Sequence, residues 1–128
     1  MNFPTHLKYT TSHEWINVEA DGTLTVGITE HAQEALGDIV FLELPNIGTS
    51  YKATQSCATI ESVKAASDIY CPIEGEIIAQ NEEAVNAPEQ INSDAFSVWL
   101  FKIKPTGDVT TALNQLLSSE QYQKEIGM

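Results

Sequence analysis

The chain has 128 residues, 42% of them hydrophobic, which predicts a single domain, residues 1–128, with one core. It carries 18 acidic residues against six lysines and no arginine, giving a formal net charge of −12. Phosphate and nucleic-acid sites rely on arginine and basic patches, so this composition argues against nucleic acids and anionic membranes as partners. No stretch reaches the roughly 20 apolar residues of a membrane span, and the N-terminus resembles neither a signal nor a transit peptide. A cytoplasmic location is expected.

The first half of the chain predicts strands around one short helix. Residues 14–19 and 23–28 read as strands joined through Asp21-Gly22, a pair typical of short hairpins. Thr29 is a suitable helix N-cap and Gly37 a suitable C-terminal stop, so the residues between them predict a helix of about two turns. Residues 39–44 predict a buried strand that ends at Pro45.

The second half predicts further strands over residues 56–61, 67–70 and 76–80. A last strand is expected over residues 98–104, with Trp99, Phe101 and Ile103 on one face. Asp38-Ile39-Val40 and Asp68-Ile69-Tyr70 each precede a Pro-x-x-Gly turn, which hints at two similar β halves.

Beyond Pro105 the sequence predicts helices. Leu113, Leu116 and Leu117 have the spacing of one buried helix face, and residues 118–121 fit a capping box for a second helix. The fold class predicted from all these elements is mainly β, with a short inserted helix and C-terminal helices.

The segment with the most chemical information is Glu61-Ser62-Val63-Lys64-Ala65-Ala66-Ser67-Asp68. It lies between two predicted strands, so we expect a tight hairpin turn with Lys64 pointing into solvent. Short neighbours leave its ammonium group accessible to another protein. The alternative is an ordinary surface lysine.

Cys57 and Cys71 lie seven residues on either side of Lys64. We expect them to be two reduced core residues, with a disulfide as the alternative. The three histidines are too scattered in sequence for a metal-ligand motif, so no metal site is predicted, and no arrangement typical of a catalytic site is apparent.

The lysine segment resembles the lipoylation site of the glycine cleavage system H-protein family. The resemblance extends in order over almost the whole chain, through Leu7-Lys8-Tyr9-Thr10, Ser12-His13-Glu14-Trp15, Asp21-Gly22-Thr23, residues 26–38, Leu44-Pro45, Ser67-Asp68-Ile69-Tyr70 and Lys102-Ile103-Lys104-Pro105. Two departures from the family pattern affect turns: Thr54 replaces a usual glycine, and the run before Trp99 is one residue shorter.

The resemblance implies a lipoyl/biotinyl-type barrel-sandwich of two β halves with Lys64 on a hairpin turn. It implies (R)-lipoate bound covalently to Lys64, with Glu61, Ser62, Val63 and Ala65 recognised during modification. Biotin carriers usually place their lysine between methionines, and lipoyl domains of 2-oxo acid dehydrogenases usually have Asp before it. This chain has Val63 there.

The implied function is a non-catalytic shuttle of the glycine cleavage system. Lipoyl-Lys64 would accept an aminomethyl group from glycine decarboxylase, present it to the tetrahydrofolate-dependent aminomethyltransferase and be reoxidised by dihydrolipoyl dehydrogenase. A lipoate ligase or lipoyl transferase would attach the cofactor. The hard chemistry would belong to cofactors on these partners. A monomer is expected.

The cationic, aminomethyl-loaded arm needs shelter from water, and Glu14 and Asp68 are the candidate carboxylates for holding it. Three other functions stay open: a protein that relays lipoyl groups to other acceptors, an enzyme using Lys64 as a Schiff-base nucleophile, and an interaction module with an unmodified lysine. A Schiff-base lysine needs a desolvated site, which an exposed turn beside acids does not provide.

Overall fold

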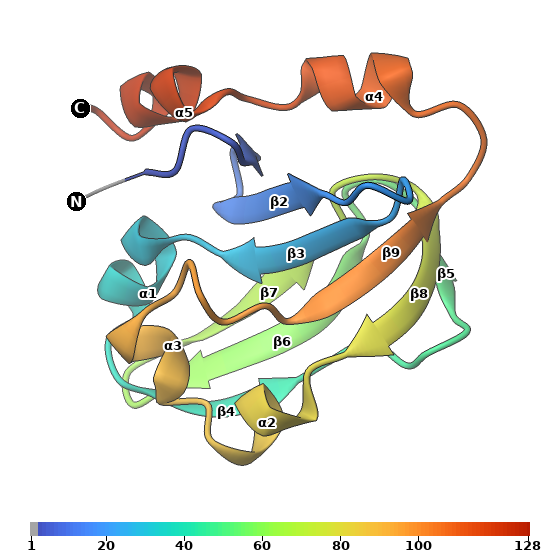
Figure 1. Ribbon diagram of the computed structural model, residues 1–128. Helices are drawn as coiled ribbons and strands as arrows, with labels where there is room; N and C mark the ends of the chain where they lie inside the picture. Colours follow the sequence, from blue (N-terminus) through green and yellow to red (C-terminus); the bar gives the residue numbers. More distant parts are fainter. Residues whose placement is uncertain (1–2) are drawn as a thin grey trace.

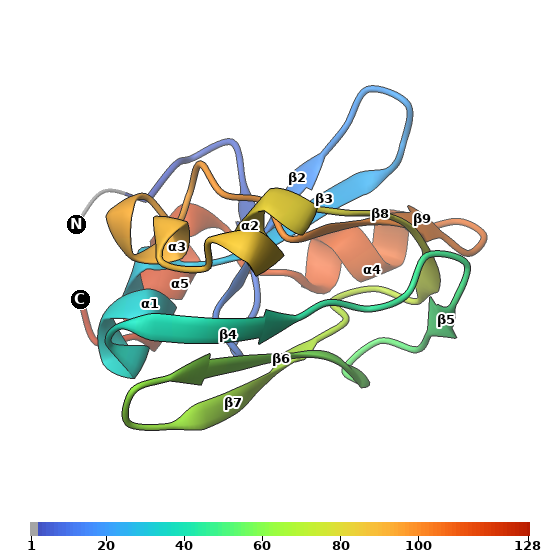
Figure 2. The same cartoon turned by 90° about the horizontal axis from the view of Figure 1, so that it is seen from below.

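The computed structural model describes residues 3–128 and contains two antiparallel sheets (Figures 1 and 2). The six-stranded sheet has, in spatial order, β1 (Lys8–Tyr9), β2 (Glu14–Val18), β3 (Leu24–Ile28), β9 (Phe101–Pro105), β8 (Gly75–Gln80) and β5 (Ser50–Tyr51). The three-stranded sheet has the order β4 (Ile39–Glu43), β6 (Ser56–Ser62) and β7 (Ala66–Tyr70). A mainly β fold is therefore confirmed.

The predicted N-terminal hairpin and helix are present. β2 and β3 pair antiparallel, and Gly22 takes a positive φ of 87° in the loop that joins them. Helix α1 (Glu30–Leu36) begins after Thr29, whose side-chain oxygen accepts a hydrogen bond from the backbone N–H of Ala32. It ends at Gly37, where φ is 84°. Both helix boundaries follow from these capping residues.

The main core lies between the two sheets. Inward-facing aliphatic side chains of both sheets are buried there, among them Ile16, Leu24, Val26, Ile60 and Ile69. A second hydrophobic cluster joins the N-terminal segment to the C-terminal helix and consists of Phe3, Leu7, Tyr9, Trp15 and Tyr122.

The prediction of a buried strand after α1 is wrong in part. Ile39 and Leu42 are buried, whereas Val40 is 56% exposed and Phe41 46% exposed. The register between β4 and β6 shifts between Ile39 and Phe41, which marks a β-bulge at Val40. A bulge adds one residue to one strand and interrupts the inward–outward alternation, so two successive apolar side chains face solvent.

The last strand is shorter than predicted, because β9 begins at Phe101. Phe101 and Ile103 are buried in the main core as expected, but Trp99 precedes the strand and packs on the second cluster. Two short helices that were not predicted, α2 (Glu82–Asn86) and α3 (Gln90–Ser93), occupy the segment between β8 and β9.

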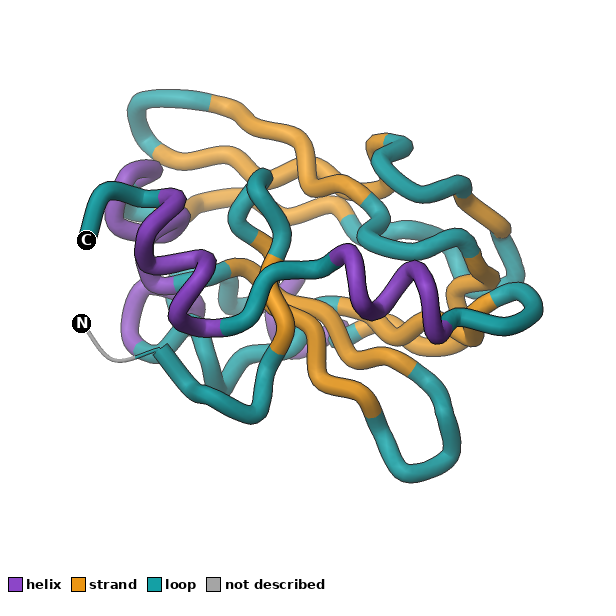
Figure 3. The backbone as a smooth tube through the Cα atoms, turned by 90° about the horizontal axis from the view of Figure 1, so that it is seen from above, coloured by secondary structure: helices purple, strands orange, loops and turns teal. Residues whose placement is uncertain are grey.

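The chain ends in α4 (Thr110–Gln115) and α5 (Ser119–Glu125), which lie along one side of the molecule, joined by an extended segment (Figure 3). The capping box predicted at Ser118 is present, with Gln121 as its partner. The predicted leucine face is not a single helix face, since α4 ends before Leu116 and Leu117 packs on the second cluster. None of the helices over residues 3–128 has the length and apolar character to cross a membrane.

Candidate functional site: the Lys64 turn and its acidic groove

Lys64 lies in the three-residue loop between β6 and β7, as predicted. The loop is held by Ser62, whose hydroxyl oxygen lies 3.3 Å from the backbone nitrogen of Lys64 and 3.1 Å from that of Ala65. The backbone N–H of Ser62 also donates to the carbonyl of Ala65 at 2.7 Å. The main chain on both sides of the lysine is therefore fixed while its side chain projects outward.

The residues predicted to guide modification occupy two environments. Glu61, Val63 and Ala65 are exposed, and Val63 is the most exposed of the large apolar residues at 69%. Ser62 is buried, so it can influence a modifying enzyme only through the shape of the turn. Ser62 therefore supports the turn, whereas Glu61, Val63 and Ala65 are accessible to a partner protein.

One side of the lysine turn rests on the segment that follows α1. The backbone N–H of Val63 donates to the carbonyl of Asp38 at 3.0 Å. A Cβ placed on Gly37 would lie 3.4 Å from Cε of Lys64, so the lysine side chain passes over this glycine at van der Waals distance. A methyl group at position 37 would make an ordinary van der Waals contact with the lysine side chain, which shows how close Lys64 lies to the end of α1.

A groove of about 180 Å³ lies along α1 near this turn. We call it the α1 groove; it is lined by Ser12, His13, Glu14, Ile28, Ala32, Ala35, Leu36, Ile60, Ser67, Asp68 and Ile69. Leu36 directly precedes Gly37, and Ser67 follows the lysine turn by two residues, so the groove leads from the turn toward Glu14. Its walls are mainly apolar, and its carboxylates belong to Glu14 and Asp68.

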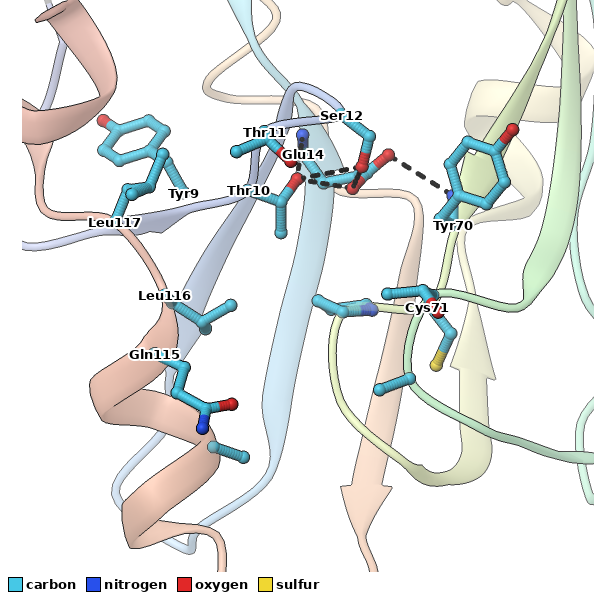
Figure 4. A pocket seen from close by; sticks show the side chains of 14 residues that line it. Tyr9, Thr10, Thr11, Ser12, Glu14, Tyr70, Cys71, Gln115, Leu116 and Leu117 are labelled. Carbon is cyan, nitrogen blue, oxygen red and sulfur yellow. Dashed lines mark hydrogen bonds between the residues drawn. The ribbon is translucent and has the colours of Figure 1, made fainter. Parts of the chain in front are cut away.

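Glu14 is 1% exposed and is held by neutral donors. Its carboxylate accepts hydrogen bonds from the hydroxyls of Thr10 at 2.5 Å and Ser12 at 2.6 Å and from the backbone N–H of Tyr70 at 3.3 Å (Figure 4). Burial raises the pKa of Glu14 above its usual range, although these hydrogen bonds oppose the shift. A cation placed beside this carboxylate would favour its charged form and oppose the effect of burial.

Glu14 also lines a second cavity of about 460 Å³, which lies between the β1–β2 turn and the linker from α4 to α5 (Figure 4). One side of this second cavity is formed by Gln115, Leu116 and Leu117, and the opposite side by Tyr70 and Cys71. Thr54, at its edge, has a φ of 69°. The chain thus keeps there the left-handed conformation that glycine adopts more readily.

His13 is the last residue of the turn that leads into Glu14, the first residue of β2. Its φ of 72° is unusual for a residue other than glycine, and its ring Nδ1 lies 2.8 Å from the Tyr122 hydroxyl. The same hydroxyl lies 2.8 Å from Oγ1 of Thr29, the N-cap of α1. Burial and the neighbouring His31 lower the pKa of His13. Tyr122 comes from α5, and sequence reasoning assigned it no part in the site.

The two cysteines are buried and free, as predicted. Each thiol donates to a backbone carbonyl, Cys57 to Ile69 at 3.6 Å and Cys71 to Ile73 at 3.2 Å. Contact with the Cys71 thiol and burial raise the pKa of Cys57. Over residues 3–128, no group of three or more His, Cys, Asp and Glu side chains is arranged to hold a metal ion.

Two facing sheets with an exposed lysine on a hairpin turn define the barrel-sandwich class of lipoyl and biotinyl carrier domains. The chain belongs to the glycine cleavage H-protein family, whose family model matches residues 7–127. The predicted resemblance and the predicted barrel-sandwich fold are thereby confirmed.

Several relatives support this assignment. The chain is 61% identical over 127 residues to the glycine cleavage system H protein of Aromatoleum aromaticum, covering 98% of this chain and 96% of the relative. It is 58% identical over 126 residues to the H protein of Ralstonia nicotianae, covering 98% of both chains. The crystal structure of the H protein from Mycobacterium marinum superposes with a TM-score of 0.89 at 37% identity, covering 98% of this chain and all of that one.

The family defines the general role of the chain. Glycine cleavage H proteins are lipoate carriers of the glycine cleavage system, and the chain is a carrier component rather than a catalyst. Its partners belong to that system.

Proposed function

We propose that residues 1–128 form one lipoyl-carrier domain and that Lys64 is the residue that bears (R)-lipoate, joined through an amide bond. The observation that carries this proposal is the Lys64 turn: an exposed lysine on a main chain fixed by Ser62. A modifying enzyme needs both an accessible amine and a reproducible backbone around it. Glu61, Val63 and Ala65 are the exposed neighbours available for recognition.

The surroundings of Lys64 fit a long, flexible attachment. The lysine side chain passes over Gly37, and the mainly apolar α1 groove begins beside it. Its apolar lining suits a hydrocarbon arm, and its far end contains the buried carboxylate of Glu14. A carrier arm therefore has a path along the protein surface that ends at a negative charge.

Bound lipoate would supply a dithiolane able to carry an aminomethyl group from glycine decarboxylase to the aminomethyltransferase, with reoxidation by dihydrolipoyl dehydrogenase. The protein's own residues supply position and shelter. Glu14 and Asp68 line the α1 groove and would hold the ammonium group of the loaded arm, while apolar side chains such as Leu36 and Ile60 exclude water from it.

The negative charge of the chain suits a protein that binds several partners one after another. A net charge of −12 keeps copies of the chain apart and favours partners that present basic faces, including the lipoate ligase or lipoyl transferase. We propose a monomer that acts in the cytoplasm. Tethering the arm to such a carrier raises its effective concentration at each partner in turn.

Intact-mass measurement after incubation with lipoate, ATP and a lipoate ligase tests the proposal. The wild-type protein should gain one lipoyl group, Lys64→Arg should gain none, and Lys52→Arg, which changes another exposed lysine, should gain one. A folded wild type without mass gain would contradict the proposal and favour an unmodified interaction module. A borohydride-trapped adduct of the apo-protein with a carbonyl substrate would instead favour the Schiff-base enzyme.

A further inference from the structure

Asn92, on α3, clamps the segment that supports the Lys64 turn. Its Oδ1 accepts the backbone N–H of Ile39 at 2.9 Å. Its Nδ2 lies 2.9 Å from the carbonyl oxygen of Gly37 and 2.9 Å from Oε1 of Gln33, and donates to both. One half-buried side chain thus joins α1, its C-terminal stop and the first residue of β4.

The segment needs such a clamp because residues 37 and 38 belong to no helix or strand, and Ile39 is only the first residue of β4. The last carbonyls of a helix have no partner within the helix, and at Gly37 the chain turns away with a φ of 84°. Ile39 then begins β4, whose ladder is interrupted at once by the bulge at Val40. The Asn92 amide takes the place of the missing backbone partners.

The clamped segment is in turn the support of the lysine. The carbonyl of Asp38, between the two clamped residues, accepts the N–H of Val63 at 3.0 Å. Gly37 lies against the Lys64 side chain. A continuous set of contacts therefore leads from Asn92 through residues 37–39 to the turn, although Asn92 makes no hydrogen bond with either Val63 or Lys64.

We propose that Asn92 is a positioning residue for Lys64: its amide fixes residues 37–39 so that the lysine turn presents a single conformation to the modifying enzyme. The last step of this inference rests on the proposed lipoylation of Lys64. Without the amide, the turn samples several conformations and only a fraction of molecules is competent to bind the enzyme. The apparent affinity then falls by that fraction, while the rate of reaction after binding is unchanged.

The first test measures the turn itself, in the unmodified protein, by amide hydrogen exchange. Asn92→Ala should speed exchange at Val63 about tenfold, because opening residues 37–39 removes the acceptor of its N–H. The matched control is Asn81→Ala, since Asn81 is also half-buried and donates through Nδ2 to the carbonyl of Trp99 at 2.7 Å, outside this segment. It should leave Val63 exchange unchanged.

The second test measures lipoylation kinetics with a lipoate ligase. Asn92→Ala should raise the KM for the apo-protein about tenfold with kcat unchanged, and Asn81→Ala should change neither. Both variants are to be assayed at a temperature where circular dichroism shows them fully folded. Gln33→Ala removes one of the three hydrogen bonds and should shift Val63 exchange and KM in the same direction by less, which keeps the test available if Asn92→Ala does not fold.

The outcomes separate the two proposals. If the wild type is modified but Asn92→Ala behaves like Asn81→Ala in exchange or in KM, the positioning role is overturned and the proposed function stands. A drop in kcat at constant KM would overturn it as well. If the wild type is not modified, the proposed function fails, and Val63 exchange alone still decides whether Asn92 holds the turn.

Discussion

The carboxylate of Glu14 on β2 accepts a hydrogen bond from the backbone N–H of Tyr70 on β7, across 3.3 Å. These strands belong to different sheets, so the contact joins the two halves of the fold beside the α1 groove. Within residues 3–128, no lysine or histidine forms an ion pair with Glu14. Among these residues Glu14 is thus a buried carboxylate held by hydrogen bonds alone, and burying such a charge without an ion pair is costly.

Replacing Glu14 by Gln should shorten the lifetime of the aminomethyl-loaded arm about tenfold, because the ammonium group then bonds to an uncharged amide oxygen and loses its ion pair with a carboxylate. Release of the one-carbon unit as formaldehyde, measured over time without partner enzymes, gives this lifetime. Glu19→Gln is the control, since Glu19 accepts hydrogen bonds from Asn17 and Thr25 away from the groove. An unchanged lifetime in Glu14→Gln would exclude Glu14 from holding the arm.

The same carboxylate predicts a pH dependence of folding stability. The pKa of Glu14 is raised in the folded state by burial, so the unfolded state loses its proton first as the pH increases. The stabilisation from protonated Glu14 is complete below the unfolded pKa of about 4.3 and is lost as the pH rises through the folded pKa. The free energy of unfolding of the wild type minus that of Glu14→Gln, from urea titrations, should therefore fall with rising pH in this window. A difference that grows with pH contradicts the prediction.

Tyr122→Phe should affect both stability and the arm site. It removes the hydroxyl that contacts His13 and Thr29, at a cost of about 1–3 kcal/mol for the polar groups left without a partner. The turn before Glu14, which contains His13, then loosens, and the loaded arm should decay faster. Tyr9→Phe is the matched control, since the Tyr9 hydroxyl donates to Pro4 and its ring stacks on Tyr122 at 4.8 Å. It should lower stability without changing the arm lifetime.

The bulge in β4 predicts unequal effects for two adjacent substitutions. Phe41→Ala should lower the free energy of unfolding by about 0.5 kcal/mol or less, because Phe41 is 46% exposed. Leu42→Ala should lower it by about 2–5 kcal/mol, since Leu42 is 1% exposed and its removal leaves a cavity. Urea unfolding of both variants checks this. Equal losses would mean that Phe41 is packed as tightly as Leu42.

Cys57 and Cys71 should be unreactive in the native protein. Both thiols are buried, and each donates a hydrogen bond to a backbone carbonyl, so neither is accessible to a reagent in the folded protein. A thiol-reactive chromophore should label neither cysteine at neutral pH and both after addition of denaturant. Rapid labelling of the native protein would contradict the described burial, and failure to label the unfolded protein would indicate a disulfide.

Local signals were sufficient for elements with strong caps and clear alternation. Thr29 and Gly37 set the limits of α1, and Ser118 with Gln121 set the start of α5, because capping depends on neighbours in sequence. The exposed side chains of β4 were not predictable, since a bulge depends on the register with β6 and leaves no mark in a run of apolar residues.

In the candidate site, too, some residues were predictable from the sequence and others were not. Lys64 was found from its segment and from a family resemblance, and Glu14 and Asp68 from their charge. Asn92 and Tyr122 lie 28 and 58 residues from Lys64 in sequence, and only the tertiary fold brings their side chains to residues 37–39 and to His13. Their spacing carries no periodic or capping signal that could have identified them.

The hydrogen bonds by which Ser62 fixes the lysine turn also affect how partner proteins can bind the carrier. With the arm on Lys64, as we propose, its pivot is held by Ser62, and everything the arm can reach lies within one sphere centred on this turn. On this proposal each partner must place its own catalytic centre inside that sphere, and partners whose docking surfaces cover the turn exclude one another. Partners therefore have to visit in succession, and a tightly binding one would inhibit the others simply by occupying the space.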